Sequence, residues 1–172
     1  MIPKIKKVLY ATDLSKNSAY AFRYAVNTAM KHDAKIHILH VVEPLSPQAK
    51  AQLRLYLEDK KVDQLQKNSR KELLQGIEDR LIQFAERELK DQPENMKRII
   101  GIHVVPGDPA TEILAKTDEL DCDTIIIGTH GKGALRRAFL GSVSEKVLRR
   151  IRKPVYIIPL PEGQTDITLG EI

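Results

Sequence analysis

The chain has 172 residues, a net charge of +5 and 42% hydrophobic residues, a composition typical of a globular domain long enough to bury a core. No apolar run approaches the ~20 residues of a membrane helix, and the single cysteine, Cys122, forms no intrachain disulfide. We therefore expect a cytoplasmic protein with no membrane partner. The positive charge suits an anionic partner. Tryptophan is absent and no zinc-finger or RNP-like motif occurs, so we expect no nucleic-acid partner.

Five apolar runs rich in β-branched residues predict strands, and stretches of helical periodicity separate them. The predicted strands are Ile5–Thr12, Ala34–Val42, Arg98–Val105, Asp123–Thr129 and Lys153–Leu160. Nearly continuous apolar strands that alternate with helices indicate a parallel sheet covered on both faces. The predicted fold class is therefore α/β, a doubly wound three-layer sandwich. We expect one domain over residues 1–160 and a C-terminal tail over 161–172.

Three helices are predicted between the strands. The first follows Ser15, a suitable N-cap, and a second is predicted over Gly107–Leu120 with Asp108 as N-cap and Pro109 at the first helical position. The apolar stripe of the first comprises Ala19, Phe22, Ala25, Val26, Ala29 and Met30. A third starts at Gly141, and its packed side comprises Val143, Val147 and Leu148.

The second crossover, about 44–97, is too long for one ordinary helix. Its earlier part, Gln48–Asn68, is highly charged and has few apolar residues. Two interpretations of this part stay open: a solvated extra helix or excursion, and a lid or partner-binding element. Its later part carries a stripe predicted to face the core: Leu73, Leu74, Ile77, Leu81, Phe84, Ala85 and Leu89.

The segment Ile125–Leu148 contains four of the chain's nine glycines and lies between a strand and a helix. It lacks the P-loop pattern, because Lys132 is followed by glycine and no glycine lies five places before Gly131. It also lacks the dinucleotide fingerprint, whose third glycine position is Arg136 here. A different spacing is present: Gly-x2-Gly-x9-Gly-Ser, from Gly128 to Ser142. Glycines at a strand end let the backbone approach an anion, and a helix N-terminus favours phosphate.

This spacing, "GTHGKGALRRAFLGS", resembles the signature of the ATP-binding branch of the universal stress protein family. The segments "YATDLS", "AKIHILHVVEP", "GDPATEIL" and "KPVYIIP" are similar to other parts of that family's domain. The resemblance implies an adenine nucleotide alpha hydrolase-like, Rossmann-like sandwich whose five parallel strands have the order 3-2-1-4-5. It also implies a homodimer through the last strand, Val155–Ile158.

The resemblance implies a nucleotide site, although each of these residues could instead have a purely structural role. Ala11, Thr12 and Asp13 would border the nucleotide, with Asp13 otherwise a helix cap, and Val41 would give backbone contacts to adenine or be plain core. His130 would reach a phosphate or face solvent. The residues expected to hold phosphates and ribose, or otherwise to form an ordinary turn, are Gly128, Thr129, Gly131, Lys132, Gly141, Ser142, Val143 and Ser144.

The implied cofactor is ATP, and a magnesium ion could accompany it, bound through Asp13 and the phosphates. No dedicated metal site is predicted. His37 and His40 are three apart on a strand and point to opposite faces, whereas His32 and His103 are expected to be isolated.

The favoured function is a nucleotide-binding regulatory protein of the stress response. One alternative is a slow ATP hydrolase or phosphotransferase, for which Asp13 is the acidic candidate and no catalytic residue is assigned. The other is a protein-interaction module that works through the long second crossover.

Overall fold

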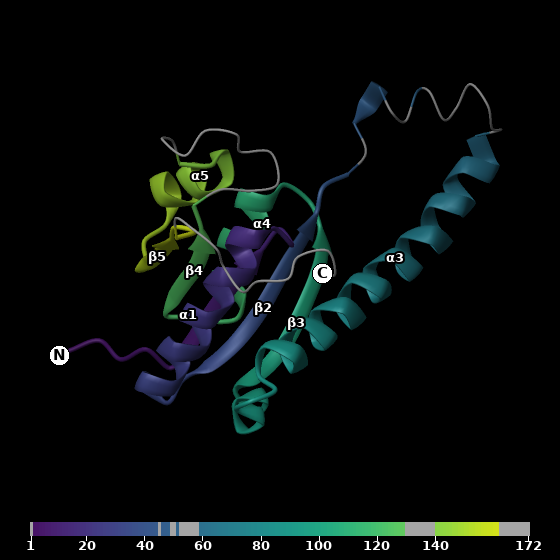
Figure 1. Ribbon diagram of the computed structural model, residues 1–172. Helices are drawn as coiled ribbons and strands as arrows, with labels where there is room; N and C mark the ends of the chain where they lie inside the picture. The colour runs from purple at the N-terminus through teal and green to yellow at the C-terminus, as the bar shows by residue number, and fades with distance from the viewer. Residues whose placement is uncertain (1, 45, 49–50, 52–58, 130–139, 162–172) are drawn as a thin grey trace.

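The computed structural model describes residues 2–44, 46–48, 51, 59–129 and 140–161, with the backbone alone for 59–69. Figure 1 shows its strands and helices alternating along the chain. The elements are β1 (Lys7–Thr12), α1 (Lys16–His32), β2 (Lys35–Val42), α3 (Asp59–Glu88), the 3-10 helix η1 (Pro93–Arg98), β3 (Ile99–Pro106), α4 (Pro109–Glu119), β4 (Thr124–Gly128), α5 (Ser142–Arg150) and β5 (Val155–Ile158).

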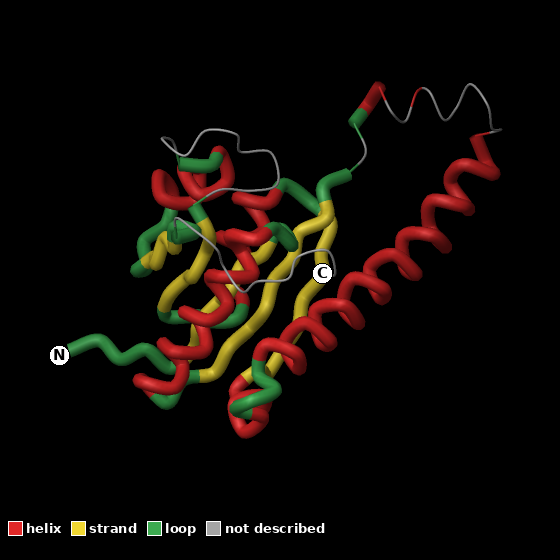
Figure 2. The backbone as a smooth tube through the Cα atoms, in the orientation of Figure 1, coloured by secondary structure: helices red, strands yellow, loops and turns green. Residues whose placement is uncertain are grey.

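The five strands form one parallel sheet in the order β3-β2-β1-β4-β5, which confirms the predicted fold class and strand order. β1 lies at the centre, with Ala11 opposite Leu39 of β2 on one side and Ile127 of β4 on the other. The strand order reverses between β1 and β4, and such a reversal opens a crevice at the carboxyl ends of the strands. Figure 2 shows the sheet as a twisted layer between helices.

Each face of the sheet has its own core, because successive strand residues point to opposite faces. α1 and α3 cover one face, where the rings of Tyr10 and Phe22 pack at a tilt with centroids 5.4 Å apart. α4 and α5 cover the other face, where Ile113 and Val147 pack on Leu9 and Ile125. The three layers are therefore those that the sequence predicts.

The predicted caps of α1 and α4 are confirmed. Ser15 and Ser18 form a reciprocal capping box at the start of α1, and the carboxylate of Asp108 accepts the backbone N–H of Thr111 at the start of α4. α5 differs, because its N-cap is Gly141, which has no side chain to satisfy the first backbone N–H groups.

From Asp59 onward the second crossover is a 30-residue helix, α3, followed by η1. Leu74 is only half-buried. Leu73, also predicted to face the core, is 52% exposed, because it lies at the cavity described below. Residues 49–50 and 52–58, the side chains of 59–69 and the tail after Pro161 lie outside the described residues, so most side chains of Gln48–Asn68 are not described. The rest of the predicted stripe is buried: Ile77, Leu81, Phe84, Ala85 and Leu89.

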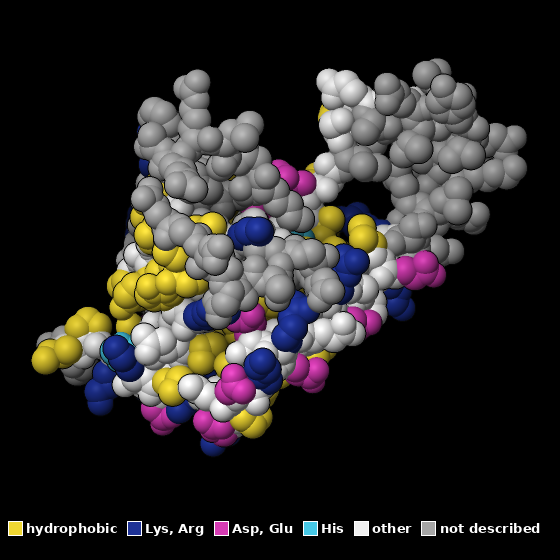
Figure 3. Space-filling model, in the orientation of Figure 1, with side chains coloured by type: hydrophobic (Ala, Val, Ile, Leu, Met, Phe, Trp, Pro, Cys, Tyr) yellow, Lys and Arg dark blue, Asp and Glu magenta, His cyan; other side chains and the backbone are white. Residues whose placement is uncertain are grey.

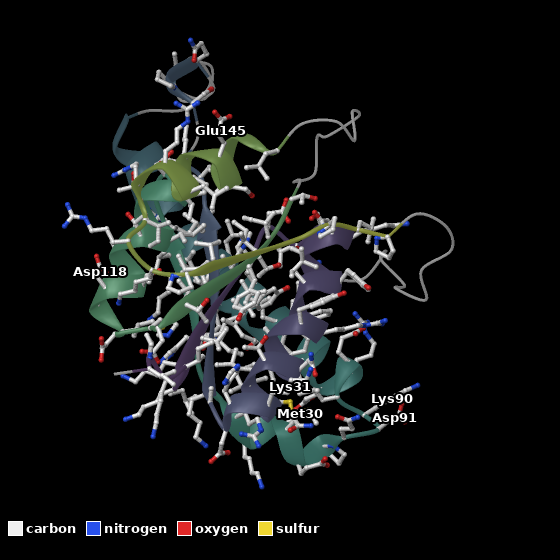
Figure 4. The ribbon with its side chains drawn as sticks, turned by 90° about the vertical axis from the view of Figure 1, so that its left-hand side faces the viewer. Met30, Lys31, Lys90, Asp91, Asp118 and Glu145 are labelled. Carbon is white, nitrogen blue, oxygen red and sulfur yellow. The ribbon has the colours of Figure 1, made fainter. Side chains whose placement is uncertain are left out.

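Two further core predictions are wrong. Met30 is 43% exposed, because it lies in the last turns of α1 beside Lys31, at the end of the molecule opposite Glu145 (Figure 4). Leu148 is also 43% exposed, because the short helix α5 turns only a narrow side with Val147 toward the sheet. Among the described helices, none has the length and hydropathy that crossing a bilayer requires.

The strand pairing brings His37 and His103 together, so the view of His103 as isolated is wrong. His37 Nδ1 lies 3.1 Å from His103 Nε2, and a Cβ at Gly101 would approach each of these atoms to 2.7–2.8 Å. His40 instead contacts the end of β1, so His37 and His40 are separate, as predicted. Burial is the main cause that lowers the pKa of both His37 and His103.

We expect the free energy of unfolding to fall on acidification because of this pair. The unfolded chain binds protons near the ordinary histidine pKa of about 6.5, whereas the folded pair stays neutral to lower pH. The loss therefore lies in the window between pH 6.5 and the lowered folded-state pKa values. Urea unfolding at several pH values should show a smaller loss in this window for His103→Gln than for the wild type. The exposed-residue control His32→Gln should keep the wild-type dependence, and an unchanged dependence in His103→Gln would contradict the assignment.

Candidate functional site

The carboxyl ends of β1, β2 and β4 border a cavity of about 670 Å³, within the range of small-molecule sites. It lies at the reversal of strand order, the usual ligand position in open α/β sheets. The starts of α4 and α5 and the middle of α3 complete its walls.

A tight turn after β1 forms the central wall. Thr12 Oγ1 lies 2.9 Å from Ser18 Oγ and accepts the N–H of Leu14 at 3.1 Å. Asp13 Oδ1 accepts the N–H of Ser15 at 3.1 Å, and Leu14 has a left-handed φ of 64°, which is unusual for a branched residue. Asp13 thus supports the turn before α1, whereas the N-cap itself is Ser15.

His40 joins the end of β2 to the end of β1. Its Nδ1 lies 2.7 Å from the carbonyl oxygen of Thr12. A carbonyl oxygen only accepts, so Nδ1 carries a proton and donates it. His40 lines the cavity. The sequence pattern does not predict this position, because the alternation of side chains along a strand indicates which face of the sheet a residue is on and not whether it borders a cavity at the strand end.

Asn17 connects the ends of β4 and β5 to the start of α1. Its Nδ2 donates to the carbonyl oxygen of Ile158 at 2.8 Å, and its Oδ1 accepts the hydroxyl of Thr129 at 3.0 Å. A Cβ on Gly128 would lie 2.8 Å from Asn17 Oδ1. Packing against Asn17 therefore explains this glycine, whereas the sequence analysis related it to the approach of an anion.

The residues at the start of α5 line the cavity. Gly141 donates its N–H to the carbonyl oxygen of Thr129 at 2.7 Å, which holds the helix start against the end of β4. The buried Ser144 hydroxyl donates to the carbonyl oxygen of Gly128 at 2.8 Å. With no side-chain cap at Gly141, the N–H groups of Ser142 and Val143 and the helix dipole make this end attractive to an anion.

α3 forms the wall opposite the start of α5 and contributes Leu73, Ile77 and Arg80. Among the described residues, Asp13 and Glu43 line the cavity with carboxylates, near the ends of β1 and β2. Arg80 is the only Lys or Arg among the described residues of its lining.

Most of the residues expected from the sequence line this one cavity: Ala11, Thr12, Asp13, Val41, Gly128, Gly141, Ser142, Val143 and Ser144. Thr129 lies next to it, on Asn17. His130, Gly131 and Lys132 lie outside the described residues. Lining residues that sequence reasoning missed include Leu14, Ser18, His40, Glu43, Leu73, Ile77 and Arg80. Within the described ranges, no group of three or more His, Cys, Asp or Glu side chains is arranged to hold a metal ion.

Comparison with known proteins identifies the family. The protein MJ0577 of Methanocaldococcus jannaschii is 28% identical over 157 residues, which cover 89% of this chain and 94% of that protein. Its solved structure has a TM-score of 0.71 at 25% identity and covers 94% of this chain and all of that one.

Two more distant solved structures share the fold. A universal stress protein in complex with cAMP is 22% identical, with a TM-score of 0.52 over 91% of this chain and 98% of that one. One from Archaeoglobus fulgidus in complex with dAMP is 20% identical, with a TM-score of 0.50 over 91% and 99%. The sequence model of the universal stress protein family matches residues 4–159, and the chain therefore belongs to this family.

Proposed function

We propose that this chain is an ATP-binding regulatory protein of the stress response. One observation carries the proposal: the start of α5, which has no side-chain cap, faces a nucleotide-sized cavity at the point where the strand order reverses. Helix N-termini of this kind bind phosphate through their N–H groups and dipole. Universal stress proteins solved with cAMP and dAMP carry adenine nucleotides, which supports the same ligand class here.

In this proposal the phosphates lie at the start of α5 and the rest of the nucleotide extends toward β1 and β2. The adenine lies near Val41, with Ala11, Thr12 and Asp13 along its side, and magnesium binds through Asp13 and the phosphates. Ser144 contributes its backbone, because its hydroxyl donates to Gly128. The residues proposed to hold phosphates and ribose are Gly128, Thr129, His130, Gly131, Lys132, Gly141, Ser142, Val143 and Ser144.

We favour binding over rapid turnover of ATP. Fast phosphoryl transfer needs a group that orients the attacking water. Asp13, the acidic candidate, has its Oδ1 engaged by the N–H of Ser15. The site offers groups that position an anion, and binding without rapid turnover fits a regulatory role.

We also propose that the protein is a homodimer paired through β5. β5 is an edge strand of the sheet, and its Tyr156 is 41% exposed. Figure 3 shows hydrophobic side chains gathered on the left of the view, the region of β5 in Figure 1. Apolar edge strands need cover, and sedimentation equilibrium would measure the dimer.

A cytoplasmic location stays a prediction from the single cysteine.

Saturating Mg-ATP should raise the melting temperature. A ligand at 100 times its Kd stabilises the native state by about 2.7 kcal/mol, or roughly 5–10 °C for a chain of this size. Differential scanning fluorimetry measures the shift, with GTP and inorganic phosphate as comparison ligands. An unchanged melting temperature with Mg-ATP would contradict the proposed function.

A further inference from the structure

We propose that Arg80 and Leu73 of α3 contact the purine base of the bound nucleotide, so that α3 sets the affinity of the site for the base. This inference rests on the proposed function. The proposed nucleotide site consists mainly of the glycine signature and the end of β1, and the inference adds two residues of the long second crossover to it.

The geometry of α3 places these side chains on one wall. Leu73, Ile77 and Arg80 are four and three positions apart, which puts them on the same side of a helix. Ile77 is buried in the core that α3 shares with the sheet. This anchored residue holds its two neighbours, which are both exposed, at the border of the cavity.

The chemistry of the two exposed side chains suits an aromatic ring. Arg80 makes no hydrogen bond or ion pair anywhere in the described part of the chain, so its guanidinium is available to a ligand. A guanidinium is planar and weakly hydrated, and it stacks on aromatic faces. Leu73 is a large apolar residue left 52% exposed at the same wall.

The position of this wall favours the base over the phosphates. The N–H groups of Ser142 and Val143 lie at the start of α5, where the phosphates are proposed to bind. Val42 at the end of β2 packs on the same core as α3, and it lines the cavity together with Leu73, Ile77 and Arg80. Apolar and planar groups on this side would enclose a purine between β2 and α3.

Calorimetric titration of adenosine, AMP and Mg-ATP tests the inference. Arg80→Ala should weaken all three ligands by a similar factor of roughly 3- to 30-fold, the range of a cation–π contact. Arg80→Lys should recover little of this loss, because lysine lacks the planar face. The matched control is Lys71→Ala, which removes an exposed cation of α3 that does not line the cavity and should leave every affinity unchanged.

Other outcomes would overturn it. A loss that is absent for adenosine, grows from AMP to ATP and is restored by Arg80→Lys would assign Arg80 to the phosphates. Wild-type affinity in Arg80→Ala would remove the contact and leave the proposed function standing, whereas a wild type that binds none of the three ligands would remove both. Equal melting temperatures of the ligand-free variants would exclude an effect through folding.

Discussion

Gly141→Asp should abolish most of the affinity for ATP and leave the fold intact. The backbone at Gly141 has φ −62° and ψ 149°, which any residue adopts, and aspartate is a favoured N-cap. The new carboxylate would satisfy the first N–H groups of α5 and place a negative charge where the phosphates are proposed to bind. Two unit charges 4 Å apart at an effective dielectric constant of 20 interact by about 4 kcal/mol, so we expect a loss of at least roughly 100-fold.

The substitution should lower the affinity for ATP without lowering the stability of the ligand-free protein, so the two effects can be told apart. The ligand-free melting temperature should stay the same or rise slightly, because the added cap is worth a few tenths of a kcal/mol over glycine. Gly141→Asn adds a cap of the same shape without the charge and should lose far less affinity. Isothermal titration calorimetry with Mg-ATP measures all three proteins. Equal losses for the two variants would indicate a steric effect, and wild-type affinity in Gly141→Asp would move the phosphates away from α5.

The layers of the fold could be predicted from local signals. Nearly continuous apolar runs such as the one in β4 indicate strands buried on both faces, and Ser15 and Asp108 indicate where helices begin. The strand order could not be predicted in this way, because periodicity contains no information on which strands are neighbours. It came from the resemblance to a family, and the register of β1 with β2 and β4 agrees with it.

The parts of the fold and of the candidate site that sequence reasoning missed depend on contacts between distant residues. His103 contacts His37 only through the pairing of β2 with β3. Arg80 and Leu73 reach the cavity because α3 lies alongside β3, a placement that follows from packing and not from its own pattern. A helical stripe predicts that Leu73 faces inward, but it does not tell whether the space beyond is core or cavity.

Asn17 is the clearest example of a residue whose role depends on contacts with distant parts of the chain. Nothing in its neighbourhood along the chain sets it apart from other polar residues in a first helical turn. It nevertheless bonds to the ends of two strands more than 110 residues away, and it explains why position 128 is a glycine. The glycine signature thus includes at least one residue that serves the packing of the protein itself.

Asn17→Ala and Gly128→Ala should each destabilise the protein, and their combination should cost less than the sum. Asn17→Ala removes the donor to Ile158 and the acceptor of the Thr129 hydroxyl, at about 1–3 kcal/mol. Gly128→Ala places a Cβ 2.8 Å from Asn17 Oδ1 and 2.9 Å from its Cγ, and such overpacking costs about 1–3 kcal/mol. Removing the amide relieves both close contacts, so we expect a coupling of about 0.5–2 kcal/mol.

Urea unfolding of the four proteins in this cycle measures the coupling. Part of the cost of Gly128→Ala should remain in the double variant, because the backbone carbon of residue 17 would still lie 3.3 Å from the new Cβ. Gly76→Ala is the matched control. A Cβ there meets nothing within 4 Å, so the same substitution inside α3 should stabilise the protein by about 1 kcal/mol. Strictly additive costs would mean that Asn17 is not what excludes a side chain at position 128, and the anion would again become the reason for that glycine.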